Sequence, residues 1–463
     1  VNYRYGSPEN MFDGHSYPKG GRVLHMLRFE LGDEMFWRAM RHYAEVNQFR
    51  NVETANLRIA IEDATGHGMN WFFDQWLYHG GHPEFTVDWA WDGAAKDVRV
   101  TVKQTQKVDE TTPLFRTAAE IEIALPGETL IKRIQITRPE ETFHFQVNER
   151  PTRVCFDPAD WILKKLTFPK SKEELIDQMT RDSHVVCRVQ AVRGLTEQRE
   201  DPQVSAALLK VARNDSFWAV RLEAVRLVGK LNGDEARAAL LAIAKGDAKS
   251  SVRREALVGL ANFSHDDTRA LVRQAIASDP SYFVVAEALR CLMKIDRDNA
   301  RDALLAALDQ PSESEVILSA ACDGLVELKD ATAARRVAKV LEETLPPQRR
   351  AALLGALARL KPGDAEILQR LHAQLDSKRR EVRRAAIDSV VALGDASSVA
   401  VLQARRGKEV SPRGVRAIDE ALEKLRDRQK NGAPLQSEIE ALRRRNDELE
   451  LRLKTLENRS DSK

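Results

Sequence analysis

Residues 11–28 read MFDGHSYPKGGRVLHMLR, and the expected organisation of the chain follows from them. The first part predicts a loop and the second a helix, because Pro18 has the backbone angle φ that suits a first helical position. Apolar residues then recur at the spacing of one helical face, at Val23, Leu24, Leu27 and Leu31. The pattern predicts that the loop delivers Tyr17 to a cleft, at the N-terminus of this helix.

Five short motifs in this region resemble the M1 family of zinc aminopeptidases, the gluzincins. They are Phe12-Asp13, Tyr17-x-Lys19-Gly20, Val23-Leu24-x-Met26-Leu27, the run Asn51-Val52-Glu53-Thr54 and the aromatic run from Trp71 to Trp76. Their order along the chain matches the family as well as their composition, and the resemblance extends to about residue 80. Residues 1–82 are therefore interpreted as the C-terminal half of an M1-like catalytic domain.

The resemblance implies a catalytic role for one residue, Tyr17. In the family this tyrosine donates a hydrogen bond to the oxyanion that forms when water attacks a peptide carbonyl. His15 and Lys19 are of residue types that can act as an acid, a base or an anion binder, but a solvated loop histidine and a surface lysine are the favoured interpretation. Glu53 and Asp74 are predicted to cap a helix or form a structural pair rather than to bind a metal.

The zinc motif of the family is missing from the sequence. A gluzincin needs two histidines one helical turn apart, a glutamate between them and a third, carboxylate ligand. None of the ten histidines stands in an H-E-x-x-H motif. Since this motif precedes the tyrosine segment in the family, we interpret the chain as a fragment whose zinc ligands lie upstream of residue 1. The intact protein is expected to bind zinc and a peptide substrate, whereas the fragment alone is expected to hold no cofactor and to be inactive.

The first eighty or so residues show the period of amphipathic helices, and the next region shows a period of two. Helices are predicted over 33–46, over 52–64 and on the aromatic run that ends at Gly80-Gly81. Between residues 83 and 168, apolar and polar residues alternate in five short runs, which turn-forming pairs such as Asp92-Gly93 and Pro126-Gly127 separate. This pattern predicts a small β-sandwich at residues 83–168, the place where the M1 family has one.

Residues 169–430 carry an internal repeat. Asp182, Asp215, Asp247 and Asp279 follow one another at spacings of 33, 32 and 32 residues. An arginine stands six positions after three of them, and an alanine stands nine positions after each, at Arg188, Arg221, Arg253, Ala191, Ala224, Ala256 and Ala288. The period resembles short HEAT repeats and predicts an α-solenoid of about seven helix pairs. The aspartate is expected to cap a turn, and the arginine to reach the aspartate of the adjacent repeat.

The last segment, residues 431–463, is predicted to be a linker followed by a coiled coil. After Gly432-Ala433-Pro434, a heptad seam runs through Leu435, Ile439, Leu442, Asn446, Leu449, Leu453 and Leu456. The buried asparagine position and three pairs of opposite charge favour a parallel homodimer through residues 435–459. The alternative is a single solvated helix, because the seam is just over three heptads long.

Composition excludes some classes of function. The 72 basic and 70 acidic side chains nearly cancel, so the charge favours neither nucleic acid nor a membrane surface as a partner. No apolar run approaches the roughly 20 residues of a membrane span, which predicts a soluble chain. The four cysteines lack C-x-x-C spacing and are typical of buried thiols in a reducing compartment, so the cytoplasm is slightly favoured although localisation stays undetermined.

Two functions are compatible with these patterns. The first is an M1-type aminopeptidase that hydrolyses N-terminal peptide bonds. The second is a catalytically inactive M1-like scaffold that binds partner proteins through its HEAT array and coiled coil. Retention of Tyr17 within its full motif favours the enzyme, because a scaffold has no chemical need for that phenol.

Overall fold

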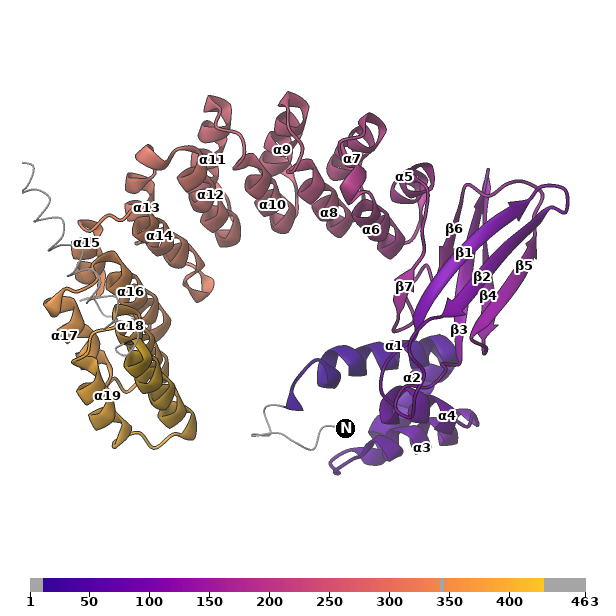
Figure 1. The fold of residues 1–463 in the computed structure, drawn as a ribbon, viewed down its shortest axis with the longest axis horizontal. Helices are drawn as coiled ribbons and strands as arrows, with labels where there is room; N and C mark the ends of the chain where they lie inside the picture. The colour runs from indigo at the N-terminus through magenta and orange to yellow at the C-terminus, as the bar shows by residue number, and fades with distance from the viewer. Residues whose placement is uncertain (1–10, 342–344, 429–463) are drawn as a thin grey trace, which may run out of the picture. The chain divides into compact units, whose positions relative to one another are not determined.

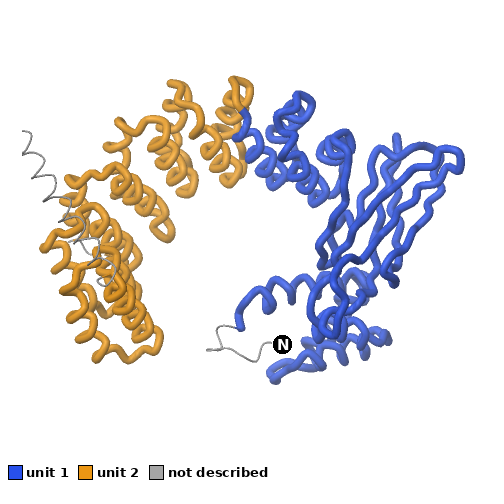
Figure 2. Tube along the Cα trace, viewed as in Figure 1, with its two compact units in different colours: residues 1–231 blue, residues 232–463 orange. Residues whose placement is uncertain are grey.

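The computed structural model describes residues 11–341 and 345–428, and the chain divides into two compact units, residues 1–231 and 232–463 (Figure 2). The predicted fold class is confirmed, because helices dominate and one small region of strands interrupts them (Figure 1). The coiled coil predicted for residues 435–459 lies outside the described residues. Within the described ranges, no helix combines the length and the apolar character that a membrane span needs.

The first unit opens with short helices at the predicted positions. They are η2 (His15–Lys19), α1 (Gly20–Leu31), α2 (Asp33–Asn47), α3 (Thr54–Thr65), α4 (Asn70–Phe73) and η3 (Asp74–Tyr78). The helix around Tyr17 begins earlier than predicted, because Lys19 N–H donates to Gly14 O at 3.0 Å and closes a wide π-helical turn. Pro18 fits inside this turn, since a first-turn N–H has no intrahelical acceptor to lose. Tyr17 therefore lies within the opening turn rather than before it.

Seven strands follow the helices and form two sheets. They are β1 (Glu84–Asp92), β2 (Asp97–Gln104), β3 (Thr117–Leu125), β4 (Glu128–Ile136), β5 (Glu140–Gln146), β6 (Arg153–Phe156) and β7 (Lys165–Thr167). One sheet has the order β5-β2-β1-β7 and the other β4-β3-β6. The alternation of apolar and polar residues predicts β1 to β5 and misses the last two strands. β6 has four residues that are all buried, and β7 has three residues, so neither shows a period of two.

The helices and the strands of the first unit share one hydrophobic core. Leu27 of α1 and Trp76 of η3 belong to the same buried cluster as Ile121 and Ile123 of β3. The rings of Trp76 and Phe115 lie 5.1 Å apart between centroids, which joins the aromatic helix to the chain that leads into β3. The segment that carries Tyr17 is therefore held by packing against the sandwich.

Pairs of helices make up the described residues from 172 to 428, in agreement with the predicted repeat (Figure 1). The first unit contains α5 (Lys172–Arg181), α6 (Val185–Gly194), α7 (Pro202–Asn214) and α8 (Trp218–Val228). The second unit contains α9 (Asp234–Gly246), α10 (Ser250–Leu260), α11 (Asp266–Ser278), α12 (Tyr282–Ile295), α13 (Arg301–Ala307), α14 (Val316–Glu327), α15 (Ala333–Leu341), α16 (Pro347–Leu360), α17 (Ala365–Gln374), α18 (Arg380–Leu393), α19 (Ser398–Arg406) and a helix over 412–428.

The repeated aspartate and arginine act as predicted within each unit. Arg188 donates to both carboxylate oxygens of Asp215 at 2.8 and 3.0 Å, and Arg253 makes the same contact with Asp279 at 2.8 Å twice. Each of these aspartates also accepts a backbone N–H two residues later, which caps the turn before the second helix of its pair. The contact joins one repeat to the next, which explains why the two residue types recur together.

Candidate active-site segment around Tyr17

Tyr17 is exposed at the surface of the first unit. Its relative exposure is 72%, and its ring stacks on that of Phe12 with 6.2 Å between centroids. Among the described residues, none makes a hydrogen bond with its phenol. The turn that presents the phenol is held by its own backbone and by the neighbouring loop.

The loop before Tyr17 is held by short-range hydrogen bonds. The carboxylate of Asp13 accepts from the backbone N–H of His15 at 2.8 Å and lies 3.2 Å from its ring nitrogen Nδ1. These hydrogen bonds hold the pKa of Asp13 below its ordinary value. Ser16 donates its hydroxyl to Met11 O. The His15 side chain is 82% exposed, which agrees with the prediction of a solvated loop histidine.

Helix α1 is anchored to the loop that follows β6. Arg22 donates to the carboxylate of Asp160 at 2.7 Å, and Lys164 binds the same carboxylate at 2.9 Å. The imidazole of His25 stacks on Trp161 with 4.4 Å between centroids, and its burial lowers its pKa. Sequence reasoning assigned no partner to Arg22, since Asp160 lies 138 residues away and no periodic pattern connects them.

Glu53 and Asp74, which are expected to have structural roles rather than to bind a metal, have structural partners. Glu53 is the N-cap of α3, and its backbone N–H donates to Asn56 Oδ1 at 2.8 Å. Asp74 pairs with His79, whose Nδ1 lies 3.5 Å from the carboxylate and 3.1 Å from the backbone oxygen of Asp74. Both predictions of a cap or a structural pair are confirmed.

The described residues near Tyr17 do not fit a catalytic zinc. Two groups of His, Cys, Asp and Glu side chains lie close enough to hold a metal ion in the part of the chain that the structure describes. Neither group includes a residue of the segment 11–78.

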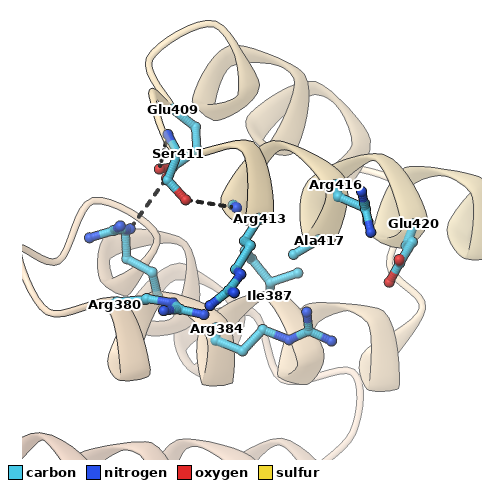
Figure 3. Close-up of a pocket in the computed structure, with 11 residues that line it drawn as sticks. Arg380, Arg384, Ile387, Glu409, Ser411, Arg413, Arg416, Ala417 and Glu420 are labelled. Atoms are coloured by element: carbon cyan, nitrogen blue, oxygen red, sulfur yellow. Dashed lines mark hydrogen bonds and ion pairs between the residues drawn. The ribbon is translucent and has the colours of Figure 1, made fainter. Parts of the chain in front are cut away.

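A basic pocket of about 480 Å³ lies in the second unit, between α18 and the helix over 412–428 (Figure 3). Arg380 and Arg384 project from α18, and Arg413 and Arg416 from the other helix. At its inner end, Glu409 is bound by Arg405 at 2.8 Å. The pocket contains no residue of the Tyr17 segment, and its excess of guanidinium groups suits an anionic ligand.

Two family profiles match the chain. The family described as Peptidase family M1 domain matches residues 3–76, and the one described as HEAT repeats matches residues 173–256 and 238–326. Residues 3–76 are therefore similar to the M1 peptidase domain, and residues 173–326 to HEAT repeats. This confirms the resemblance inferred from the Tyr17 motifs and from the 32-residue period.

Individual relatives are aminopeptidases. Residues of this chain are 40% identical over 72 residues to aminopeptidase N of Lactococcus lactis subsp. lactis, covering 16% of this chain and 8% of that protein. Glutamyl aminopeptidase of Homo sapiens is 33% identical over 79 residues, covering 17% of this chain and 8% of that protein. The matched stretches thus span about a tenth or less of these relatives.

A solved structure shows the same fold over more of the chain. The crystal structure of Legionella pneumophila aminopeptidase A in complex with aspartic acid superposes with a TM-score of 0.58 at 15% sequence identity. The superposition covers 91% of this chain and 58% of that one. At this identity the likeness defines the fold alone.

Proposed function

We propose that this chain is part of an M1-type zinc aminopeptidase in which Tyr17 stabilises the oxyanion during hydrolysis of an N-terminal peptide bond. The observation that supports this role most is an exposed phenol without an intramolecular hydrogen bond, among the residues described, in the segment that matches the M1 domain. As a peptide bond is attacked, negative charge develops on its carbonyl oxygen. A phenol within hydrogen-bond reach stabilises that charge more in the transition state than in the ground state.

The zinc of such an enzyme would come from polypeptide outside residues 1–463, because the sequence contains no H-E-x-x-H motif. The exposed apolar side chains of residues 11–78 support the proposal that additional polypeptide packs against these helices. Within residues 11–78 the large apolar side chains that remain exposed are Met11, Phe12, Tyr17, Leu24, Trp37, Val46, Phe49, Val52, Ile59 and Tyr78. This number of exposed large apolar side chains in one short region supports packing against other polypeptide.

The proposed activity is tested with aminoacyl anilides. We expect the full-length protein to cleave a substrate with a free N-terminal amine and to leave its N-acetylated analogue intact, since an aminopeptidase binds the free amine. We expect the 463-residue chain alone to cleave neither. Equal cleavage of both substrates by the full-length protein would contradict an aminopeptidase.

Hydrogen exchange tests whether the helices of residues 17–78 need to pack against further polypeptide. In the 463-residue chain, we expect amides of residues 17–78 to exchange faster than those of the solenoid helices, because an apolar face in contact with water stabilises its helices little. Mass spectrometry of peptides from the two regions makes the comparison. Equal protection of both regions would show that the helices need no further layer.

A scaffold without activity remains the second candidate function, and one observation favours it. The pocket between α18 and the helix over 412–428 presents five arginines against two glutamates, which suits an acidic segment of a partner protein. A scaffold function requires that other residues replace the zinc ligands of the family in the full-length protein. The same anilide assay separates the two candidates, since a scaffold cleaves neither substrate.

A further inference from the structure

A group of buried acidic side chains lies where the β-sandwich meets the first pair of HEAT helices. Glu122 is in the middle of β3, on the face of the sheet opposite to Ile121 and Ile123, and its side chain is fully buried. Oxygen Oε1 accepts from Arg153 at 3.2 Å. Oxygen Oε2 has no hydrogen-bond partner among the residues that the structure describes. Nδ1 of His184 lies 3.0 Å from this oxygen and forms an ion pair with it only when the imidazole is protonated. Beside a neutral imidazole, a cation that satisfies the buried oxygen would be favoured.

Two residues of the turn between α5 and α6 face this oxygen. Nδ1 of His184 lies 3.0 Å from Glu122 Oε2 and 3.3 Å from Asp182 Oδ1. Nitrogen and oxygen ligands at their usual distances from a tetrahedral zinc ion lie about 3.3 Å from one another. The three atoms thus have the spacing of ligands around one ion, and all of them lie within 4.8 Å of each other. His184 is a quarter exposed, which gives an ion a path from solvent.

Arg153 orients the carboxylates of Glu122 and Asp182 by binding the oxygens that do not face His184. It binds the other oxygen of each, Glu122 Oε1 at 3.2 Å and Asp182 Oδ2 at 3.3 Å, and also Asp177 at 2.8 Å. This is the arrangement in which an outer group orients metal ligands. Three carboxylates face this guanidinium, and Asp177 also pairs with Arg181 at 3.4 Å. Burial together with the charge of Asp182 raises the pKa of Glu122, so a metal ion that binds here must displace a proton held more tightly than usual.

We propose that Glu122, Asp182 and His184 bind a divalent transition-metal ion of the Zn²⁺ type, which joins the sandwich to the first HEAT helix pair. The ion would be structural and separate from a catalytic zinc. The sequence predicts no cofactor for this chain, because it lacks an H-E-x-x-H motif. It does not indicate this site either, because residues 122 and 182 approach one another only through packing of a strand against a helix turn. Two carboxylates and one imidazole suit zinc better than calcium, which prefers six or more oxygen ligands.

A neighbouring set of Cys155, Asp182 and Cys187 is the competing site, since both sets share Asp182. Existing partners do not by themselves separate the two sets, because Asp182 Oδ1 accepts the backbone N–H of His184 at 2.7 Å and His184 Nδ1 lies 3.3 Å from Ser183 Oγ. Cys155 Sγ lies 3.4 Å from Lys170 Nζ, and Cys187 donates to Pro158 O at 3.4 Å. A hydrogen bond with Cys155 and burial raise the pKa of the Cys187 thiol, which disfavours the thiolate that zinc needs. The oxygen and nitrogen set is therefore the better one.

The test is zinc binding by the 463-residue chain. After treatment with a chelator, titration with ZnCl₂ in a calorimeter should give one tight site per chain, and Zn²⁺ should raise the melting temperature. Glu122→Gln and His184→Gln should each weaken binding by at least 10–100-fold. Circular dichroism verifies that both variants remain folded.

Matched variants separate this site from the alternatives. Cys155→Ser and Cys187→Ser should bind Zn²⁺ like the wild type, and so should His82→Gln, which changes an exposed histidine. The proposal is wrong if the wild type has no tight site, if folded His184→Gln binds as tightly as the wild type, or if the cysteine variants alone lose the ion. None of these outcomes depends on peptidase activity, so failure of this proposal leaves the proposed function unaffected.

Discussion

Tyr17→Phe in the full-length protein is expected to lower kcat by about 10²–10³-fold, the usual effect of removing one donor to an oxyanion. The substitution removes only the hydroxyl, and the ring can keep its stacking contact with Phe12. Because the phenol acts in the transition state, kcat should fall while KM changes little. Zinc content should be unchanged, since the role proposed for Tyr17 is not that of a metal ligand. Turnover of an aminoacyl anilide and metal analysis of the same sample measure both quantities.

Tyr78→Phe is the matched control for this experiment. Tyr78 is the last residue of η3 in the same unit and is 59% exposed, but it is not part of the Tyr17 motif. Its loss of a hydroxyl should leave kcat within about twofold, because a surface substitution of this kind changes little. Wild-type turnover in Tyr17→Phe would remove Tyr17 from the mechanism, while a loss of zinc would assign it a different role.

The features that the sequence predicts well are those repeated or patterned over short distances. The 32-residue spacing of Asp247 and Asp279 identifies the solenoid and pairs Arg253 with the next repeat. Apolar periodicity places the helices of the first unit and the longer strands. Each of these signals arises because a helix or strand must bury one face, so the chemistry of neighbouring residues is enough to find it.

Features that depend on contacts between distant residues are not predicted. Arg22 finds Asp160 only because α1 packs against the loop after β6. Glu122 looks like an outward-facing residue of an alternating strand, and its burial follows from the packing of the α5–α6 turn over that face. The π-helical turn at Tyr17 is missed for another reason, since Pro18 suits the first turn of an α-helix equally well.

Arg153→Met is expected to destabilise the first unit by about 3–5 kcal/mol, the usual result of removing one partner from a buried ion pair. The Arg153 side chain is 6% exposed, and it binds Glu122, Asp177 and Asp182. Methionine keeps much of the volume of the side chain, so the loss reports the uncompensated carboxylates rather than a cavity. All seven tryptophans of the chain lie within residues 1–231, so urea unfolding followed by tryptophan fluorescence reports this unit alone.

Arg193→Met provides the control, because its side chain is 64% exposed and it pairs with Glu223 at 2.6 Å in the same unit. An exposed pair contributes about 1 kcal/mol or less, so the transition midpoint should move little. The two variants remove the same charge from the same unit and differ in burial. If both shift the midpoint equally, net charge rather than the buried network determines the stability of this junction. A large loss in Arg153→Met alone would assign the stability of this junction to the buried network rather than to net charge. The loss is expected to be larger in the chelated protein, because no metal ion then offsets the charge of Glu122.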